Sequence, residues 1–287
     1  MITFTDKTRS TPRIAYGLRG DAGSPVLLIM GFGMSGSAWV PQARTLSETH
    51  RCCMYDHLGV GASDAGPAFP TIASMAGDAL RLMDELGWER AHIVGVSMGG
   101  MIAQELALRA QDRCLSLTLI ATHGGAFGAS MPRPRAVYLF IKSILGHGQA
   151  RTEALDELLY PPGVLDSLDP ALKLVGREAD LDEPPSMRTF VGELSAVYRH
   201  RTEARLGRLR LPTLLVRPGG DILIDPKQTD RLAERIPNAT VIRFEDAGHG
   251  VTFHKARELN AALLDHFDAA DRRDSHPSTD TNHSHHA

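Results

Sequence analysis

One serine stands between a strand pattern and a helix pattern in the segment His92-Ile93-Val94-Gly95-Val96-Ser97-Met98-Gly99-Gly100. The residues before the serine are mostly apolar and β-branched, which predicts a buried strand, and residues 98–110 predict a helix. A tight turn between these elements would hold the serine hydroxyl clear of the sheet, and Gly95 and Gly99 leave room where strand and helix come close. The N–H groups at the start of the helix would face a developing oxyanion. We therefore expect Ser97 to be a catalytic nucleophile.

A catalytic serine needs a base, and the base needs an acid that orients it. On a parallel sheet of this kind the three follow in the order serine, acid, histidine, each just after a strand. Residues 211–217 predict a buried strand whose exit turn leads to Asp221, and residues 239–244 predict a further strand whose exit turn leads to His249. We expect Asp221 to be the acid and His249 to be the base.

Other residues compete for these roles. Asp225 follows Asp221 closely, but its position before Pro226 favours an N-cap of the helix predicted over residues 226–236. Cys53 and Cys114 have no neighbouring base, so buried apolar positions are expected for them. Seven further histidines match no strand end after the acid and are expected to be surface or core groups: His57, His92, His123, His147, His200, His254 and His266.

Short strand patterns alternate with helix patterns along most of the chain, which predicts a mostly parallel, doubly wound α/β sheet. One helix is marked by Thr71 as its N-cap and Gly87 as its end. The stretch between Ala121 and Leu211 is far too long for an ordinary connection, and it contains helix patterns at 134–144, 151–159 and 185–205. We expect core parts at residues 1–124 and 211–269, a helical substructure at 125–210 and a disordered tail at 270–287.

The chain resembles the α/β-hydrolase superfamily from about Ile14 to about Phe267. The resemblance is carried by the serine turn, the acid turn with Asp221, the Ala247-Gly248-His249 segment and two glycine-rich segments. The first of these, Leu27-Leu28-Ile29-Met30-Gly31-Phe32-Gly33, is similar to the family's His-Gly-x segment, with Met30 where the histidine is usual. The second, Tyr55-Asp56-His57-Leu58-Gly59-Val60-Gly61-Ala62-Ser63, is similar to its Asp-x-Arg-Gly-x-Gly-x-Ser loop, with Leu58 where the arginine is usual.

This resemblance implies an α/β-hydrolase fold with a helical lid inserted after the sixth strand, near Ala121. It also implies an oxyanion hole formed by the backbone N–H groups of Phe32 and Met98. The lid would shape the substrate pocket. Its apolar and aromatic residues are expected to face either the core or the ligand: Tyr138, Leu139, Phe140, Leu159, Tyr160, Phe190 and Tyr198.

Composition excludes several classes of function. The chain has 287 residues, 43% of them hydrophobic, and a formal net charge of −3 without a long basic run, so no nucleic-acid partner is expected. No signal peptide and no run of about 18 apolar residues is apparent, so no membrane partner is expected. Three cysteines cannot all pair, which favours reduced thiols and a cytoplasmic location. The tail contains His276 and other histidines, but no metal role is expected of them.

The residues together predict a serine hydrolase that cleaves a small ester or lactone through an acyl-enzyme, with no cofactor and no metal. The expected partner is a small-molecule substrate, and the oligomeric state is not predicted. Relatives with the same triad act as carbon–carbon bond hydrolases, thioesterases, lyases and cofactor-free perhydrolases, so these activities remain alternatives. Enol-lactonases and small methylesterases are the nearest look-alikes. A hydrolase-like ligand receptor with little turnover is an alternative of another class.

Overall fold

The structure is a computed structural model that describes residues 4–125, 133–168 and 185–275. Eight strands form one sheet in the order β1-β2-β4-β3-β5-β6-β7-β8. The strands are β1 (Asp6–Lys7), β2 (Ala15–Arg19), β3 (Pro25–Ile29), β4 (Arg51–Tyr55), β5 (Ala91–Val96), β6 (Cys114–Ile120), β7 (Thr213–Pro218) and β8 (Ala239–Phe244). The β1–β2 and β2–β4 pairs are antiparallel and all other pairs are parallel. The mostly parallel sheet expected from the sequence is confirmed.

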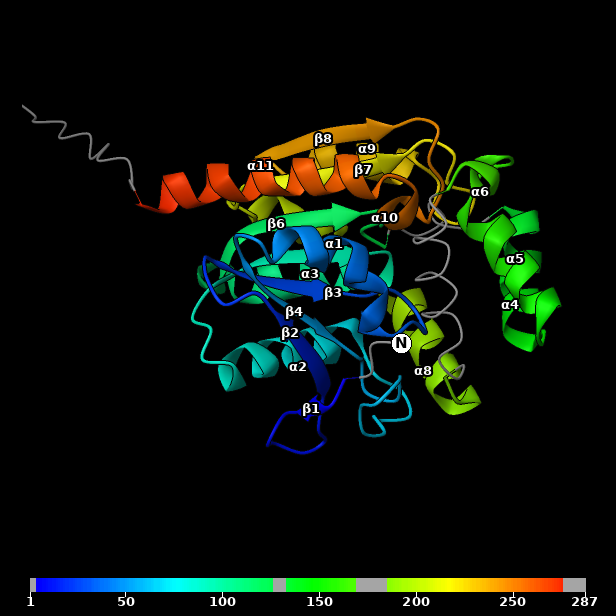
Figure 1. The fold of residues 1–287 in the computed structure, drawn as a ribbon, viewed down its shortest axis with the longest axis horizontal. Helices are drawn as coiled ribbons and strands as arrows, with labels where there is room; N and C mark the ends of the chain where they lie inside the picture. The colour runs from blue at the N-terminus through cyan, green and yellow to red at the C-terminus, as the bar shows by residue number, and fades with distance from the viewer. Residues whose placement is uncertain (1–3, 126–132, 169–184, 276–287) are drawn as a thin grey trace, which may run out of the picture.

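Helices cover both faces of this sheet (Figure 1). On one face lie α1 (Val40–Leu46), α10 (Val251–His254) and α11 (Ala256–Ser275), and on the other lie α2 (Ile72–Glu85), α3 (Met98–Arg109) and α9 (Lys227–Arg235). Short 3-10 helices occur at Gly36–Trp39 (η1), Gln111–Arg113 (η2) and Glu203–Arg208 (η3).

Side chains alternate between the two faces along each strand, and this alternation divides the core into two layers. The buried side chains of Cys52 and Cys53 belong to different layers, as the sequence predicts for neighbours in a strand. Thr71 and Ser74 close α2 with a reciprocal capping box, in which Thr71 Oγ1 accepts from the Ser74 N–H at 3.0 Å. The N-cap expected at Thr71 is therefore confirmed.

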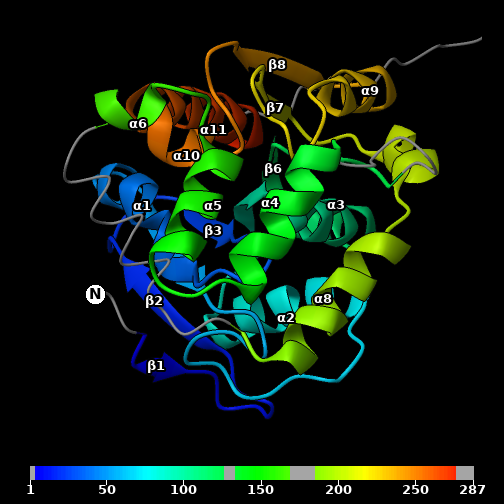
Figure 2. The ribbon, with the colours of Figure 1, turned by 90° about the vertical axis from the view of Figure 1, so that its right-hand side faces the viewer.

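A helical segment separates β6 from β7. It contains α4 (Pro134–Leu145), α5 (Gln149–Leu159), α6 (Val164–Ser167) and α8 (Met187–Arg199). Figure 1 shows these helices beyond the carboxyl ends of the parallel strands, and Figure 2 looks onto that end with α4, α5 and α8 in front. The last of these helices ends at residue 199, earlier than the sequence pattern predicts, and η3 follows it.

The prediction of a disordered tail from residue 270 is wrong for residues 270–275, because α11 continues to Ser275. Tertiary contacts hold its last turns. Ala270 is buried, the Ser24 hydroxyl donates to Asp271 Oδ2 at 2.7 Å, and Arg90 pairs with Asp274. A polar helix end that looks aperiodic in sequence is thus stabilised by residues far away in the chain. The remainder of the predicted tail, including His276, lies outside the described residues.

None of the helices in the described ranges combines the length and the apolar character needed to cross a membrane.

Candidate active site

Ser97 occupies the sharp turn between β5 and α3. Its backbone has φ 55° and ψ −121°, a positive φ that non-glycine residues seldom adopt. The Ser97 N–H donates to the Ile120 carbonyl at 2.9 Å, and the Ser97 carbonyl accepts from the Thr122 hydroxyl at 2.7 Å. Both bonds join the strained turn to residues 120–122 at the end of β6, and these bonds hold the turn in place.

The glycines that flank Ser97 are required by close backbone contacts. A Cβ atom on Gly95 would lie 2.2 Å from the Gly99 carbonyl oxygen, and a Cβ atom on Gly99 would lie 2.1 Å from the Ile29 carbonyl oxygen. Gly31 packs directly on the serine, since its Cβ atom would lie 3.2 Å from Ser97 Cβ. The sequence-based explanation of Gly95 and Gly99 agrees with these distances.

Asp221 and His249 lie on neighbouring loops after β7 and β8. The two side chains are joined at 2.7 Å between Asp221 Oδ2 and His249 Nδ1, and Asp221 is 2% exposed. Asp221 Oδ1 accepts from the N–H groups of Leu223 and Ile224 at 2.8 and 3.0 Å, which fixes the carboxylate. Because a carboxylate accepts at Nδ1, that nitrogen carries the proton and Nε2 remains available as a base.

Asp225, the rival acid, has another role. Its Oδ1 accepts from the Lys227 N–H at 2.9 Å at the start of α9. This side-chain bond satisfies one of the unpaired donors at the start of α9, but the N-cap is Pro226, one residue later than the sequence predicts. The bond between carboxylate and His249 is made by Asp221.

Ser97 and His249 both line a cavity of about 280 Å³. Within the described residues the Ser97 hydroxyl makes no hydrogen bond to His249. Catalytic hydrogen bonds are often long before substrate binds. Phe32 also lines this cavity, whereas Met98 is buried at the first position of α3, directly after the serine. The five residues expected at the site thus lie on segments that meet at one end of the sheet.

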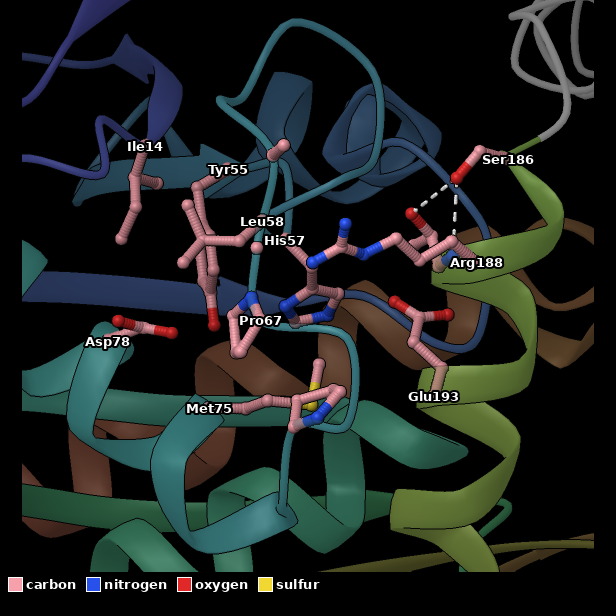
Figure 3. A pocket seen from close by; sticks show the side chains of 14 residues that line it. Ile14, Tyr55, His57, Leu58, Pro67, Met75, Asp78, Ser186, Arg188 and Glu193 are labelled. Carbon is pink, nitrogen blue, oxygen red and sulfur yellow. Dashed lines mark hydrogen bonds between the residues drawn. The ribbon is translucent and has the colours of Figure 1, made fainter.

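Two side chains support the segment that contains Phe32. The His57 imidazole donates through Nε2 to the Met30 carbonyl at 2.9 Å, and Glu193 Oε2 accepts from the Gly33 N–H at 2.9 Å. His57 and Glu193 also line a smaller cavity of about 70 Å³, and Figure 3 shows their side chains there. His57 is buried, as expected of a core histidine, and its bond to Met30 gives it a supporting position near the site.

Glu193 is a functional candidate that the sequence analysis missed. Burial raises the pKa of its carboxyl to about 7, although the bond from Gly33 opposes that shift, and Glu193 Oε1 has no hydrogen-bond partner among the described residues. A signal existed in the sequence: Glu193 stands three residues after Phe190 and four before Val197, on the apolar stripe of α8. A single acid on such a stripe is unusual.

The helices between β6 and β7 close over Phe32. The Phe32 ring makes edge contacts with Phe140 of α4 and Phe190 of α8, at centroid distances of 5.5 and 5.2 Å. Of the seven residues expected to face core or ligand, Phe140, Leu159 and Phe190 line the larger cavity, whereas Tyr138 and Tyr198 are 63% and 72% exposed. These two tyrosines do not line the cavity and are mostly open to solvent on the outer faces of α4 and α8.

The cysteines and the candidate metal ligands do not line the cavity that contains Ser97 and His249. Cys52, Cys53 and Cys114 are free and buried, and burial raises the pKa of each thiol, so none is poised as a nucleophile. Among the described residues, His50, His92 and Asp271 could hold a metal ion, with ligand atoms within 4.8 Å of one another. His92 is near the start of β5 and Ser97 follows its end, so about 16 Å of strand separates them. An ion there would not reach the cavity.

The chain is similar to known proteins in both sequence and fold. The sequence profile of the family described as alpha/beta hydrolase fold matches residues 24–256. A protein of Azorhizobium caulinodans, RutD, named as a candidate carbamate hydrolase, is 32% identical, with 87% of this chain and 92% of the relative covered. Two solved structures are similar: Est816, described as an N-acyl homoserine lactone degrading enzyme (TM-score 0.77, 25% identity, 91% and 99% covered), and the enol-lactonase of Burkholderia xenovorans LB400 (TM-score 0.79, 23% identity, 92% and 100% covered).

Proposed function

The chain belongs to the α/β-hydrolase family, and from that premise we propose that it is a serine hydrolase that cleaves a small carboxylic ester or lactone. Ser97 is the proposed nucleophile, His249 the base and Asp221 the acid, with Phe32 and Met98 as oxyanion donors. One observation carries the proposal: a serine held at positive φ and a histidine bonded to a buried carboxylate line the same cavity.

The proposed first half-reaction forms an acyl-enzyme. His249 Nε2 accepts the proton of the Ser97 hydroxyl while Ser97 Oγ bonds to the carbonyl carbon of the substrate. Collapse of the tetrahedral intermediate breaks the bond to the alcohol oxygen, which takes the proton from His249. Asp221 remains ionised and stabilises the imidazolium through the 2.7 Å contact at Nδ1.

The second half-reaction uses water in place of the alcohol. His249 removes a proton from water, which attacks the acyl carbon, and the same proton returns to Ser97 as the acid leaves. In both halves the N–H groups of Phe32 and Met98 would stabilise the oxyanion. Each donor would lower the activation free energy by on the order of 3 kcal/mol. Every proposed step uses groups of the chain and water, so no cofactor or metal is required.

We assign the lid function to the segment at residues 125–210. Its described helices contribute Phe140, Leu155 and Phe190 to the cavity wall, which is mostly apolar. A wall of this kind excludes water and accommodates a partly hydrophobic acyl or alcohol group. A small ester or lactone matches the size of the cavity, and the similar protein Est816 is described as degrading a lactone.

The name of the RutD relative favours a second candidate substrate, a carbamate. A carbamate ester has a carbonyl carbon that the same serine could attack, although nitrogen donation makes that carbon less electrophilic. Thioesters and carbon–carbon bonds remain alternatives on the same grounds of shared chemistry. An assay of matched esters, lactones, carbamates, thioesters and vinylogous diketones, run side by side, separates these classes by relative kcat/KM.

Turnover of p-nitrophenyl acetate and butyrate by the wild type and by Ser97→Ala tests the proposal. We expect multiple turnover by the wild type and a loss of at least about 1,000-fold in the variant, because the remaining groups offer no nucleophile. Equal rates would remove Ser97 from the mechanism. Stoichiometric binding of ester without repeated turnover by the wild type would instead support the receptor alternative.

A further inference from the structure

Arg151 is the only arginine or lysine among the described residues that line the cavity with Ser97 and His249. It stands in the first turn of α5, and most of the wall around it is apolar. The apolar part includes Met30, Phe140, Ile144, Leu155, Leu158 and Leu223. Arg151 is partly buried, and its position in such a wall requires an explanation, because charged side chains seldom lie against apolar surface without a partner.

Helix geometry directs Arg151 at the cavity. Leu155 and Leu158 follow it by four and seven residues, which places all three on one face of α5, and all three line the cavity. The acidic residues Glu153, Asp156 and Glu157 lie on the opposite half of the helix. The carboxylates of α5 itself therefore point away from Arg151.

The Arg151 guanidinium has no partner within the described part of the chain. Its Nε is buried without a hydrogen bond, and no ion pair or side-chain hydrogen bond involves it. Arg135 of α4, by contrast, pairs with Glu157. The position also costs stability, since a positive charge in the first turn opposes the helix dipole. Neither an ion pair nor the helix accounts for an arginine at this position.

We propose that Arg151 binds a carboxylate group of the substrate, so that this hydrolase acts on esters or lactones that also bear a free carboxylate. This inference rests on the proposed function, because it assigns a substrate class to the same cavity. Arginine suits the role: its planar guanidinium can donate two parallel hydrogen bonds to a carboxylate, and the apolar surroundings strengthen the contact. The positive end of the helix dipole adds to the attraction of an anion.

The position of Arg151 along α5 sets the distance between the two ends of the substrate. The carboxyl end of α5 is held to the catalytic loop, because the Gly250 N–H donates to the Leu159 carbonyl at 2.8 Å. Arg151 lies eight residues earlier, about 12 Å along the helix axis. Arg151 and the catalytic loop thus lie at opposite ends of α5, so the carboxylate that Arg151 binds and the scissile carbonyl belong to different ends of the substrate.

Paired ester substrates test this inference. We would compare p-nitrophenyl hemiglutarate, which carries a free carboxylate, with the neutral p-nitrophenyl valerate for the wild type, Arg151→Met, Arg151→Lys and Arg133→Met. Arg133 is an exposed arginine of the same segment that does not line the cavity. We expect Arg151→Met to reduce the preference for the hemiglutarate by about 10-fold to 100-fold, through KM, with little change for the valerate. Arg151→Lys should keep part of the preference, and Arg133→Met all of it.

A binding measurement separates this inference from the proposed function. Glutarate, the acid released from the hemiglutarate, is titrated into the wild type and Arg151→Met by calorimetry, which requires no turnover. Weaker binding to Arg151→Met supports the carboxylate site even if the wild type hydrolyses neither ester, a result that would refute the proposed function alone. Equal glutarate binding, or an equal loss of activity on both esters, would overturn the assignment of Arg151.

Discussion

The backbone of Ser97 is strained, and the close packing of Gly95 and Gly99 around it stabilises this conformation. A residue at φ 55° and ψ −121° costs about 1–3 kcal/mol relative to relaxed backbone, which the packing of the turn must offset. That packing depends on the absence of side chains at Gly95 and Gly99, where carbonyl oxygens approach to within 2.2 Å of the position of a Cβ atom. The Ser97 hydroxyl is therefore positioned by glycines that have no side chain of their own to contribute to the proposed chemistry.

The first prediction concerns Gly99. We expect Gly99→Ala to lower the free energy of unfolding by at least about 2 kcal/mol and to reduce turnover, because its Cβ atom would lie 2.1 Å from the Ile29 carbonyl oxygen. Gly77→Ala in α2 is the matched control: its Cβ atom meets nothing within 4 Å, so it should stabilise by up to about 1 kcal/mol. Urea unfolding of both variants measures the difference. Similar effects at the two positions would contradict the packing argument.

The second prediction concerns the acid. Asp221→Asn should lower kcat for p-nitrophenyl butyrate by roughly 1,000-fold to 10,000-fold, because an amide can stabilise the wrong tautomer of His249 and does not stabilise its imidazolium. Asp225→Asn should stay within about threefold of the wild type, since asparagine caps a helix as well as aspartate. Steady-state kinetics of the two variants decide between them. The reverse order would show that Asp225 is the acid.

At the scale of elements, α8 connects the helical segment between β6 and β7 to the segment that contains Phe32. The connection is the bond from the Gly33 N–H to Glu193, together with the edge contact between Phe190 and Phe32. A protonated or ionised carboxyl can accept from Gly33, so the bond persists on both sides of the pKa of about 7, but the ionised form is buried at a cost. The protein should therefore be sensitive to pH at this helix.

The third prediction follows from that cost. Burial raises the pKa of Glu193 from 4.5 to about 7, so between those values the folded protein keeps a proton that the unfolded chain releases. The free energy of unfolding therefore falls as pH rises through this window, by at most about 3 kcal/mol. Glu193→Gln cannot ionise and should gain stability relative to the wild type from pH 5 to pH 8 in urea unfolding. The exposed Glu153→Gln is the control, and a parallel pH dependence of the wild type and Glu193→Gln would refute the account.

How much of each element the sequence predicts depends on where its stabilising contacts come from. The helix after Thr71 is predicted well because its cap and its apolar stripe are local. The last turns of α11 are missed because Ser24 and Arg90, which contact them, are almost 200 residues or more away in the chain. Glu193 and Arg151 are missed for a related reason: their contacts depend on how the segment between β6 and β7 folds back over the sheet.

For the whole molecule, the topology of the sheet explains why three distant residues could be proposed together. β5, β7 and β8 run parallel, so their carboxyl ends lie at one edge, and Ser97, Asp221 and His249 each follow one of these ends. Strand patterns are local and readable, which makes this edge predictable from sequence. The substrate is less predictable, because the cavity wall comes from helices whose packing over that edge is not encoded in a local pattern.

The central claim is that Ser97 is the activated nucleophile, and covalent labelling measures this most directly. The wild type, Ser97→Ala and His249→Ala are treated with a fluorophosphonate, and the adducts are located by intact mass and peptide mass spectrometry. We expect one adduct per chain, at Ser97, in the wild type, none in Ser97→Ala, and labelling at least about 100-fold slower in His249→Ala, because the base that activates the hydroxyl is gone. Labelling of Ser97→Ala at the wild-type rate, or an adduct at another residue of the wild type, would contradict the account.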